Sequence, residues 1–168
     1  ESIDRVEHYA RSADITIEVD VPDMMPAINV DQSRIEQVLV NLLNNAIKFS
    51  GRGYEVRVSA VPTPAATLIR VQDFGAGILP EDIPRVFERF YKSDRARNSD
   101  GTGLGLAIAK HIVAAHGGTI TVDGHSLSNE RTQALVGLSY LPQSPRFHPH
   151  LTVRQILEHS ESKLLFVG

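Results

Sequence analysis

Three asparagines and a lysine share one short stretch of the chain. Asn41, Asn45 and Lys48 are spaced by four and three residues, so in a helix they lie on one face, and Asn44 lies beside them. Asparagine is a poor helix-interior residue because its side chain competes with the backbone for hydrogen bonds. An amide oxygen can bind Mg²⁺ and a lysine can bind a phosphate. The pattern therefore indicates a metal and phosphate site, and the alternative is an ordinary solvated polar face.

A carboxylate and two glycines follow an expected strand. Asp73 ends the alternating run, and Gly75 and Gly77 come directly after it. A carboxylate there can accept a hydrogen bond from an exocyclic amine, and glycines let a flat ligand approach the backbone closely. The alternative is a plain strand-to-helix turn. Asp73-Phe74-Gly75 also matches the metal-binding tripeptide of eukaryotic protein kinases, but none of the other motifs of those kinases is present.

A further glycine-rich stretch opens the next expected helix. It consists of Gly101, Thr102, Gly103, Leu104, Gly105 and Leu106. Glycines at a helix N-terminus expose backbone N–H groups and the positive end of the helix dipole, which favours phosphate binding. The dinucleotide fingerprint is excluded because it needs glycine at position 106, and the chain has no Walker A sequence.

An aromatic segment precedes a cationic loop. Phe87-Glu88-Arg89-Phe90-Tyr91 is followed by Lys92, Arg95 and Arg97. Aromatic anchors at the root of a loop that carries cations are typical of a lid that closes over phosphates. The alternative is a set of core aromatics beside a solvated charge cluster.

A long amphipathic helix is expected to position the asparagines. It begins after Asp31 as N-cap, with an incomplete capping box because Arg34 stands at the third position, and it ends at 50–53. Its apolar stripe consists of Ile35, Val38, Leu39, Leu42, Leu43, Ala46 and Ile47.

The other elements follow from apolar periodicity. We expect helices at 1–12, at 104–115, at about 153–159 and, in short form, around Pro80; strands at 15–21, 54–58, 67–72, 119–122 and 134–141; and a mobile loop at 92–102. The second and third strands are joined by the turn Pro62-Thr63-Pro64, which favours an antiparallel pair.

Composition limits the possible classes of protein. The chain has 168 residues, 42% of them apolar, and a net charge of −3. That fits a soluble globular domain without the basic excess of a non-specific nucleic-acid binder. With no cysteine, disulfide scaffolds, thiolate metal sites and cysteine nucleophiles are excluded. No apolar stretch is long enough to span a membrane, and the absence of an initiator methionine suggests a fragment.

The order and spacing of these motifs resemble the ATP-binding catalytic domain of sensor histidine kinases, in the superfamily that includes gyrase B, Hsp90 and MutL. The resemblance covers about residues 1–122 and implies an α+β, two-layer α/β sandwich with a mixed sheet covered on one face by helices. Four boxes carry it: N (Asn41-Leu-Leu-Asn-Asn45-Ala-Ile-Lys48-Phe-Ser50), G1 (Asp73 to Gly77), F (Phe87 to Tyr91) and G2 (Gly101 to Ile108).

The resemblance also implies roles for individual residues. Asn45 would hold Mg²⁺, Asn41 and Lys48 would be catalytic, and Asp73 would bind the adenine amine. The residues implied to bind ATP are Asn41, Asn45, Lys48, Asp73, Gly75, Gly77, Ile78, Phe87, Phe90, Lys92, Gly101, Thr102, Gly103, Leu104, Gly105 and Leu106. Phe87 and Phe90 would anchor the lid, and Lys92 would reach the γ-phosphate.

One position separates two chemistries within the superfamily. Members that hydrolyse ATP carry a glutamate, a general base for water, at the position matching Asn41. An amide has no useful basicity. The resemblance therefore favours transfer of a phosphoryl group to a positioned acceptor, with Mg²⁺ and the lid cations neutralising its charge.

The chain departs from the family in two places. None of its seven histidines lies in the sequence context of a phospho-accepting histidine, so the acceptor would belong to another domain. The usual glycine turn before the last strand is absent, and 136–143 and 150–157 are similar to the Q-loop region of an ABC-transporter ATPase, with Gln143 at the sensing position. We expect the end of a dimerisation helix or linker at 1–12, the catalytic domain at 13–142, and an irregular tail at 143–168 of fused or frameshifted origin.

As partners, the resemblance implies ATP, a histidine-containing dimerisation domain and, through it, a response regulator, with no nucleic acid. It implies a cytoplasmic domain without membrane contact of its own, in a membrane-anchored sensor. Two alternatives stay open: a nucleotide-gated binding module without phosphotransfer, and a non-functional fragment.

Overall fold

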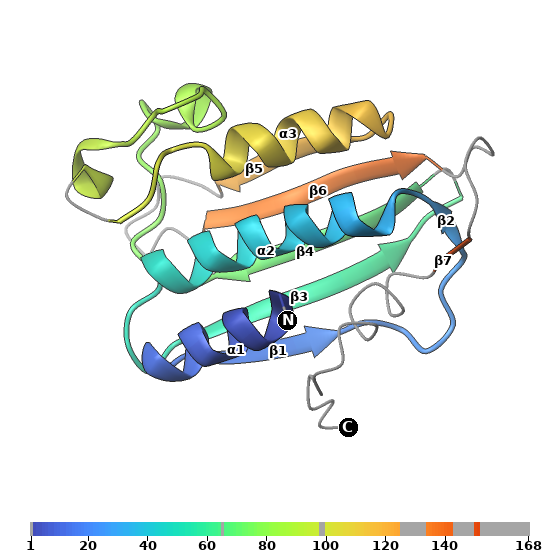
Figure 1. Ribbon diagram of the computed structural model, residues 1–168, viewed down its shortest axis with the longest axis horizontal. Coiled ribbons are helices and arrows are strands. Elements are labelled where there is room, and N and C mark those ends of the chain that lie inside the picture. Colours follow the sequence, from blue (N-terminus) through green and yellow to red (C-terminus); the bar gives the residue numbers. More distant parts are fainter. Residues whose placement is uncertain (1, 65, 98–99, 125–133, 143–149, 152–168) are drawn as a thin grey trace.

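The computed structural model describes residues 2–64, 66–97, 100–124, 134–142 and 150–151 (Figure 1). Its helices are α1 (Ser2–Ser12), α2 (Gln32–Phe49) and α3 (Gly105–Ala115), with two short 3-10 helices at Ile83–Arg85 and Asp94–Ala96. Its strands are β1 (Thr16–Asp20), β2 (Ile28–Asn29), β3 (Glu55–Pro62), β4 (Ala66–Asp73), β5 (Thr119–Gly124), β6 (Ala134–Pro142) and β7 (His150–Leu151).

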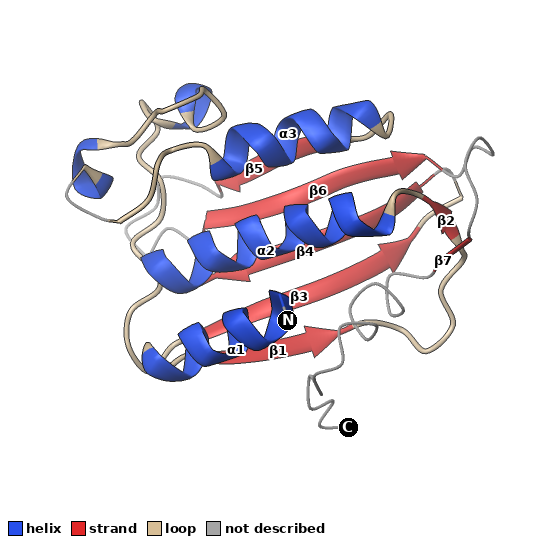
Figure 2. Cartoon of the chain, in the orientation of Figure 1, coloured by secondary structure: helices blue, strands red, loops and turns tan. Residues whose placement is uncertain are grey.

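Five of the strands form one mixed sheet in the order β1-β3-β4-β6-β5. β1 runs parallel to β3, and the other neighbouring strands are antiparallel. Parallel neighbours require a crossover connection, and α2 lies in it. The three α-helices lie across one face of this sheet (Figure 2). The expected two-layer α+β sandwich is confirmed.

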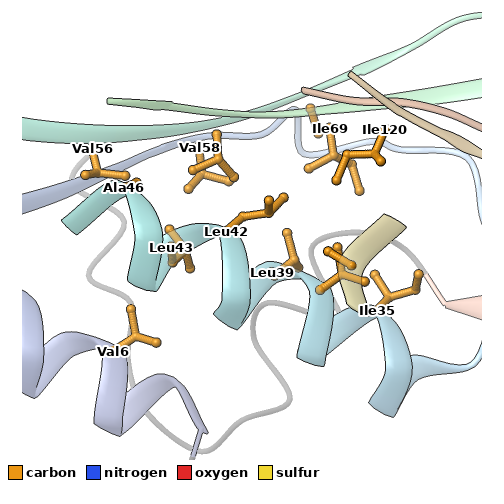
Figure 3. Packing of buried hydrophobic residues seen from close by; sticks show 14 of the residues in the cluster. Val6, Ile35, Leu39, Leu42, Leu43, Ala46, Val56, Val58, Ile69 and Ile120 are labelled. Atoms are coloured by element: carbon orange, nitrogen blue, oxygen red, sulfur yellow. The ribbon is translucent and has the colours of Figure 1, made fainter. Parts of the chain in front are cut away.

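The core lies between α2 and the sheet. All seven residues of the apolar stripe expected for this helix are buried, and Ile35 and Val38 are fully inaccessible. Figure 3 shows side chains of this stripe among Val58, Ile69 and Ile120 of the sheet. Asp31 caps the helix as expected, since its side chain accepts a hydrogen bond from the Arg34 backbone N–H. The polar face that carries the asparagines is consequently fixed in orientation.

Helix α1 belongs to the same core. Val6 and Ala10 are buried, with exposed fractions of 1% and 3%, and they join the cluster formed by α2 and the sheet. The domain boundary expected after residue 12 stays a prediction, but the described part of 1–12 packs as a component of this domain.

The structure corrects one expected element, the helix around Pro80, and confirms another, the strand at 134–141. The short helix around Pro80 is only the 3-10 helix Ile83–Arg85, because an α-helix that began at Pro80 would need a backbone N–H at position 84 to donate to the Pro80 carbonyl, and Pro84 has none. The strand expected at 134–141 is confirmed as β6, which pairs with both β4 and β5 in the interior of the sheet.

The small sheet of β2 and β7 was not expected from the sequence. Ile28 pairs with Leu151 and Asn29 with His150, so one short segment of the expected tail lies against the domain. Gln143 and the helix expected at 153–159 lie outside the described residues.

Candidate functional site

Three segments that carry the sequence motifs meet at one end of the molecule. The C-terminal end of α2, the N-terminal end of α3 and the connection between β4 and α3 lie together there (Figure 1). β4 itself ends at Asp73, and the connection begins with Phe74. The motifs that were separate in the sequence therefore border one region.

Asp73 is one of two polar residues that are buried among those described, with 8% of its surface exposed. Its Oδ1 accepts a hydrogen bond from the backbone N–H of Gly75 at 2.9 Å. Burial raises the pKa of this carboxyl, and the hydrogen bond from Gly75 opposes that effect. The carboxylate is thus held at the end of β4 in a largely dry environment, where a hydrogen-bond donor from a ligand would be bound strongly.

Gly75 lies against the end of α2 so closely that no side chain fits. A Cβ added to Gly75 would lie 2.0 Å from the backbone oxygen of Phe49 and 2.7 Å from the carbon of the same carbonyl. Glycine is therefore required by close approach of two backbones. The same contact places the end of the asparagine-bearing helix directly beside the carboxylate segment.

The asparagines of α2 differ in their bonding. Asn41 donates from Nδ2 to the backbone oxygen of Gly105, 3.3 Å away, and so contacts the first residue of α3. Asn45 is half-buried, and among the described residues its side chain has no hydrogen-bond partner. Its amide is therefore free of structural hydrogen bonds to the described part of the chain and can bind a ligand.

Lys48 connects the end of α2 to the loop before α3. Its Nζ donates a hydrogen bond to the backbone oxygen of Asp100, and it lies beside Gly101. The pKa of Lys48 is lowered, chiefly by burial and also by the positive charge of Lys92, while Asp100 opposes the shift. Two lysines that repel each other beside a glycine-rich segment form a region that favours an anion.

A backbone hydrogen bond joins the two ends of the loop between the F and G2 boxes. The backbone N–H of Phe90 donates to the oxygen of Gly103 at 3.0 Å. Gly103 has a φ of +70°, and a Cβ there would lie 2.7 Å from the backbone oxygen of Tyr91. Phe87 packs against the core as an anchor. Phe90 differs from the expectation, because its side chain is 67% exposed and it holds the loop through its backbone.

A set of side-chain contacts at the start of this loop was not predicted from the sequence. The hydroxyl of Tyr91 donates to Oδ1 of Asp82 at 2.5 Å, and the guanidinium of Arg85 lies 4.3 Å from the centre of the Tyr91 ring. The hydrogen bond to Asp82 raises the pKa of Tyr91. Asp82 and Arg85 belong to the 3-10 helix and its N-cap, but Tyr91 lies beyond that helix, so no periodic pattern in the sequence links the three residues.

The remaining predicted site residues are placed as follows. Ile78 and Gly77 lie half-buried in the segment after β4, Thr102 is exposed, and Leu104 immediately precedes α3. Leu106 packs against the core, so its side chain fixes the start of α3.

Carboxylates and histidines do not form a metal centre in the described ranges. No group of three or more such side chains gathers there. Among the described helices, none has the length and apolar character needed to cross a membrane.

Comparison with known proteins gives a consistent result. A model of the histidine kinase-, DNA gyrase B- and HSP90-like ATPase family matches residues 30–144. The sensor-like histidine kinase SenX3 of Mycobacterium tuberculosis is 45% identical over 124 residues, which is 73% of this chain and 30% of SenX3. The chain thus spans less than a third of that relative.

Solved structures agree with the sequence match. The mycobacterial sensor histidine kinase MprB superposes with a TM-score of 0.67 at 36% identity, covering 84% of this chain and 95% of that one. Full-length ShkA in complex with AMPPNP gives a TM-score of 0.67 at 28% identity, covering 86% of this chain and 29% of ShkA.

Proposed function

Because the chain belongs to the histidine kinase-, DNA gyrase B- and HSP90-like ATPase family, we propose that it is the catalytic ATP-binding domain of a two-component sensor histidine kinase. In this proposal it transfers the γ-phosphoryl group of ATP to a histidine of a separate dimerisation domain. The observation that carries the proposal is the convergence of buried Asp73, the polar face of α2 and the Lys48 contact with the loop at one end of the domain.

The site is divided between base and phosphates. We assign Asp73 to the exocyclic amine of adenine, since it is a buried acceptor beside a backbone that a flat ring can approach. We assign Lys48, Lys92 and the N-terminal end of α3 to the phosphates, because two cations and exposed helix N–H groups favour anions.

Mg²⁺ fits the donor set at this site. The amide of Asn45 makes no hydrogen bond within the described part of the chain and supplies one neutral oxygen ligand. Mg²⁺ usually keeps several waters and takes its other ligands from substrate phosphates, so a carboxylate cage is not needed. When bound, the ion neutralises charge on the phosphates.

Asn41 favours transfer over hydrolysis. It is held by its hydrogen bond to Gly105 at the start of α3, beside the proposed phosphate position. An amide cannot take a proton from water as a general base does. The acceptor would therefore be a histidine positioned by another domain, and a response regulator would receive the group from it. We place the domain on the cytoplasmic side of such a sensor.

Phosphoryl transfer can be measured directly. We expect γ-labelled ATP to label a helical dimerisation domain of a related sensor kinase when this chain is added, as an acid-labile phosphohistidine. The matched control is the same domain with its acceptor histidine replaced by alanine, which should stay unlabelled. Binding of ATP without labelling of any acceptor histidine would support a nucleotide-gated binding module instead.

The metal assignment predicts a selective loss. Asn45→Ala should weaken binding of Mg²⁺-ATP about tenfold and that of metal-free ATP much less, because only the metal complex uses the amide oxygen. Calorimetric titration with and without Mg²⁺ measures both. Asn44→Ala, one position away on the same helix, is the matched control and should change neither. Equal losses for both forms of ATP would contradict the assignment of Asn45.

A further inference from the structure

The side chain of Tyr91 is tied to the 3-10 helix that precedes it in the chain. Its hydroxyl donates to Oδ1 of Asp82 at 2.5 Å, and the guanidinium of Arg85 lies 4.3 Å from the centre of its ring. Asp82 occupies the N-cap position of Ile83–Arg85, yet its side chain accepts no capping hydrogen bond. An aspartate at that position ordinarily accepts one from a backbone N–H of the first turn. The carboxylate of Asp82 therefore holds Tyr91 and does not cap the helix.

The main chain at Tyr91 lies against the G2 box. The backbone N–H of Phe90 donates to the oxygen of Gly103 at 3.0 Å. A Cβ at Gly103 would lie 2.7 Å from the backbone oxygen of Tyr91, so the two segments are in direct backbone contact. Two residues after Gly103, α3 begins at Gly105, which Asn41 contacts. A displacement of the main chain at Tyr91 would therefore disturb the start of α3.

Lys92 depends on the same stretch of main chain. It is the next residue after Tyr91, so the two Cα atoms are about 3.8 Å apart. The positive charge of Lys92 contributes to the lowered pKa of Lys48, so the two charges lie close enough to interact. Lys48 is itself held by its hydrogen bond to the backbone oxygen of Asp100. The separation of the two lysines, and with it the positive potential offered to an anion, is consequently set by the main chain that Tyr91 anchors.

We propose that Tyr91 is a positioning residue for the phosphate end of the site: the hydrogen bond from its hydroxyl to Asp82 fixes the main chain that presents Lys92 to the nucleotide. This inference rests on the proposed function. The hydroxyl is bound to Asp82 within the protein, so Tyr91 acts through Lys92 and is not itself a ligand of ATP. The base end of the site belongs to a separate segment, which starts at Asp73 where β4 ends. Loss of the hydrogen bond should therefore affect the phosphates and spare the base.

Three substitutions isolate this hydrogen bond from the rest of the contact. Tyr91→Phe removes the hydroxyl and keeps the ring beside Arg85. Asp82→Ala removes the acceptor, whereas Asp82→Asn keeps an acceptor oxygen without the charge. Tyr9→Phe is the matched control, because Tyr9 is 39% exposed and lies on α1, which carries none of the proposed site residues.

The affinity of the whole chain for ATP in the presence of Mg²⁺ is measured by calorimetry. We expect Tyr91→Phe and Asp82→Ala each to weaken binding about threefold to tenfold, as for the loss of one hydrogen bond. The double variant should lose no more than either single variant, because all three remove the same bond. Asp82→Asn should keep most of the wild-type affinity, and Tyr9→Phe all of it. Losses that add up in the double variant would overturn the inference, since the two residues would then act separately.

The step through Lys92 is tested with a second nucleotide and in a second background. AMP, which lacks the outer phosphates, should bind wild type and Tyr91→Phe alike. In a Lys92→Ala variant, the addition of Tyr91→Phe should cause little further loss of ATP affinity, because the group that Tyr91 positions is already absent. An equal loss for AMP and ATP, or an undiminished further loss in the Lys92→Ala background, would overturn the inference in favour of a merely structural role.

Hydrogen exchange in the ligand-free protein separates failure of this inference from failure of the proposed function. The Phe90 amide donates to Gly103, so its exchange reports how firmly this main chain is held. It should exchange about threefold to tenfold faster in Tyr91→Phe than in wild type, and at nearly the wild-type rate in Asp82→Asn. An exchange rate that Tyr91→Phe leaves unchanged overturns the inference. Absence of ATP binding by the wild type, together with faster exchange in Tyr91→Phe, would reject the proposed function and leave the anchoring of this segment established.

Discussion

Asp73→Asn is expected to lower the affinity for ATP about a hundredfold. A hydrogen bond to a charged group contributes about 1.5–3 kcal/mol, and the substitution removes that charge. The new amide can also turn a donor toward the adenine amine. The same substitution should leave the fold as stable as before or more stable. Asp73 is buried, and burial disfavours its charged form. Asparagine keeps an acceptor for the N–H of Gly75 without that charge. Calorimetry and urea unfolding measure the two effects, which have opposite signs.

The raised pKa of Asp73 gives this prediction a dependence on pH. A carboxyl whose pKa is higher in the folded than in the unfolded state costs stability while it is ionised. This cost shrinks as pH falls below the folded value and is gone below the unfolded value. The stability advantage of Asp73→Asn should therefore be largest near neutral pH and vanish in acid. An unchanged ATP affinity, or a variant that is less stable than wild type near neutral pH, would contradict the account of this residue.

Gly75→Ala is expected to destabilise the domain by about 3 kcal/mol, near the upper end of the usual range for overpacking, and to abolish measurable ATP binding. The added Cβ would lie 2.0 Å from the Phe49 carbonyl oxygen. Both partners are backbone, so neither can rotate away, and the end of α2 must move from the end of β4. That movement separates Asp73 from the polar face of α2. Chemical unfolding and ATP titration measure the two losses.

Gly105→Ala is the matched control for this stability loss. Its added Cβ would approach no atom closer than 3.7 Å, where it meets Asn41. Alanine also favours a helix more than glycine does, so its unfolding free energy should stay equal or rise. Equal stability of the Gly75→Ala variant and wild type would show that the backbones do not approach as described.

The amphipathic pattern of α2 predicted its core correctly residue by residue. The seven positions of the predicted apolar stripe are all buried, since a helix of that length has one face that can meet the sheet. The strand expected at 134–141 is confirmed as β6, although the usual glycine turn before it is absent from the sequence. Periodicity predicts α2 correctly because burial of one face decides that element.

The features that the sequence did not predict depend on contacts between residues that are far apart in the chain. Glycine is required at position 75 because the Phe49 carbonyl approaches it closely. The hydrogen bond from the Asp31 backbone N–H to Nε2 of His116 joins residues 85 positions apart. Neither contact has a periodic signal in the sequence. The pairing of β2 with β7 is two residues long and equally lacks one. Pro84 limits the short helix expected around Pro80 to one 3-10 turn, because it lacks the backbone N–H that a longer helix would need.

The most direct test is a crystal structure of this chain with Mg²⁺ and a non-hydrolysable ATP analogue. We expect the adenine amine within hydrogen-bond distance of the Asp73 carboxylate, the ion on the Asn45 amide oxygen, and the triphosphate between Lys48 and the start of α3. A purine ring bound away from Asp73, or an ion bound away from Asn45, would contradict it.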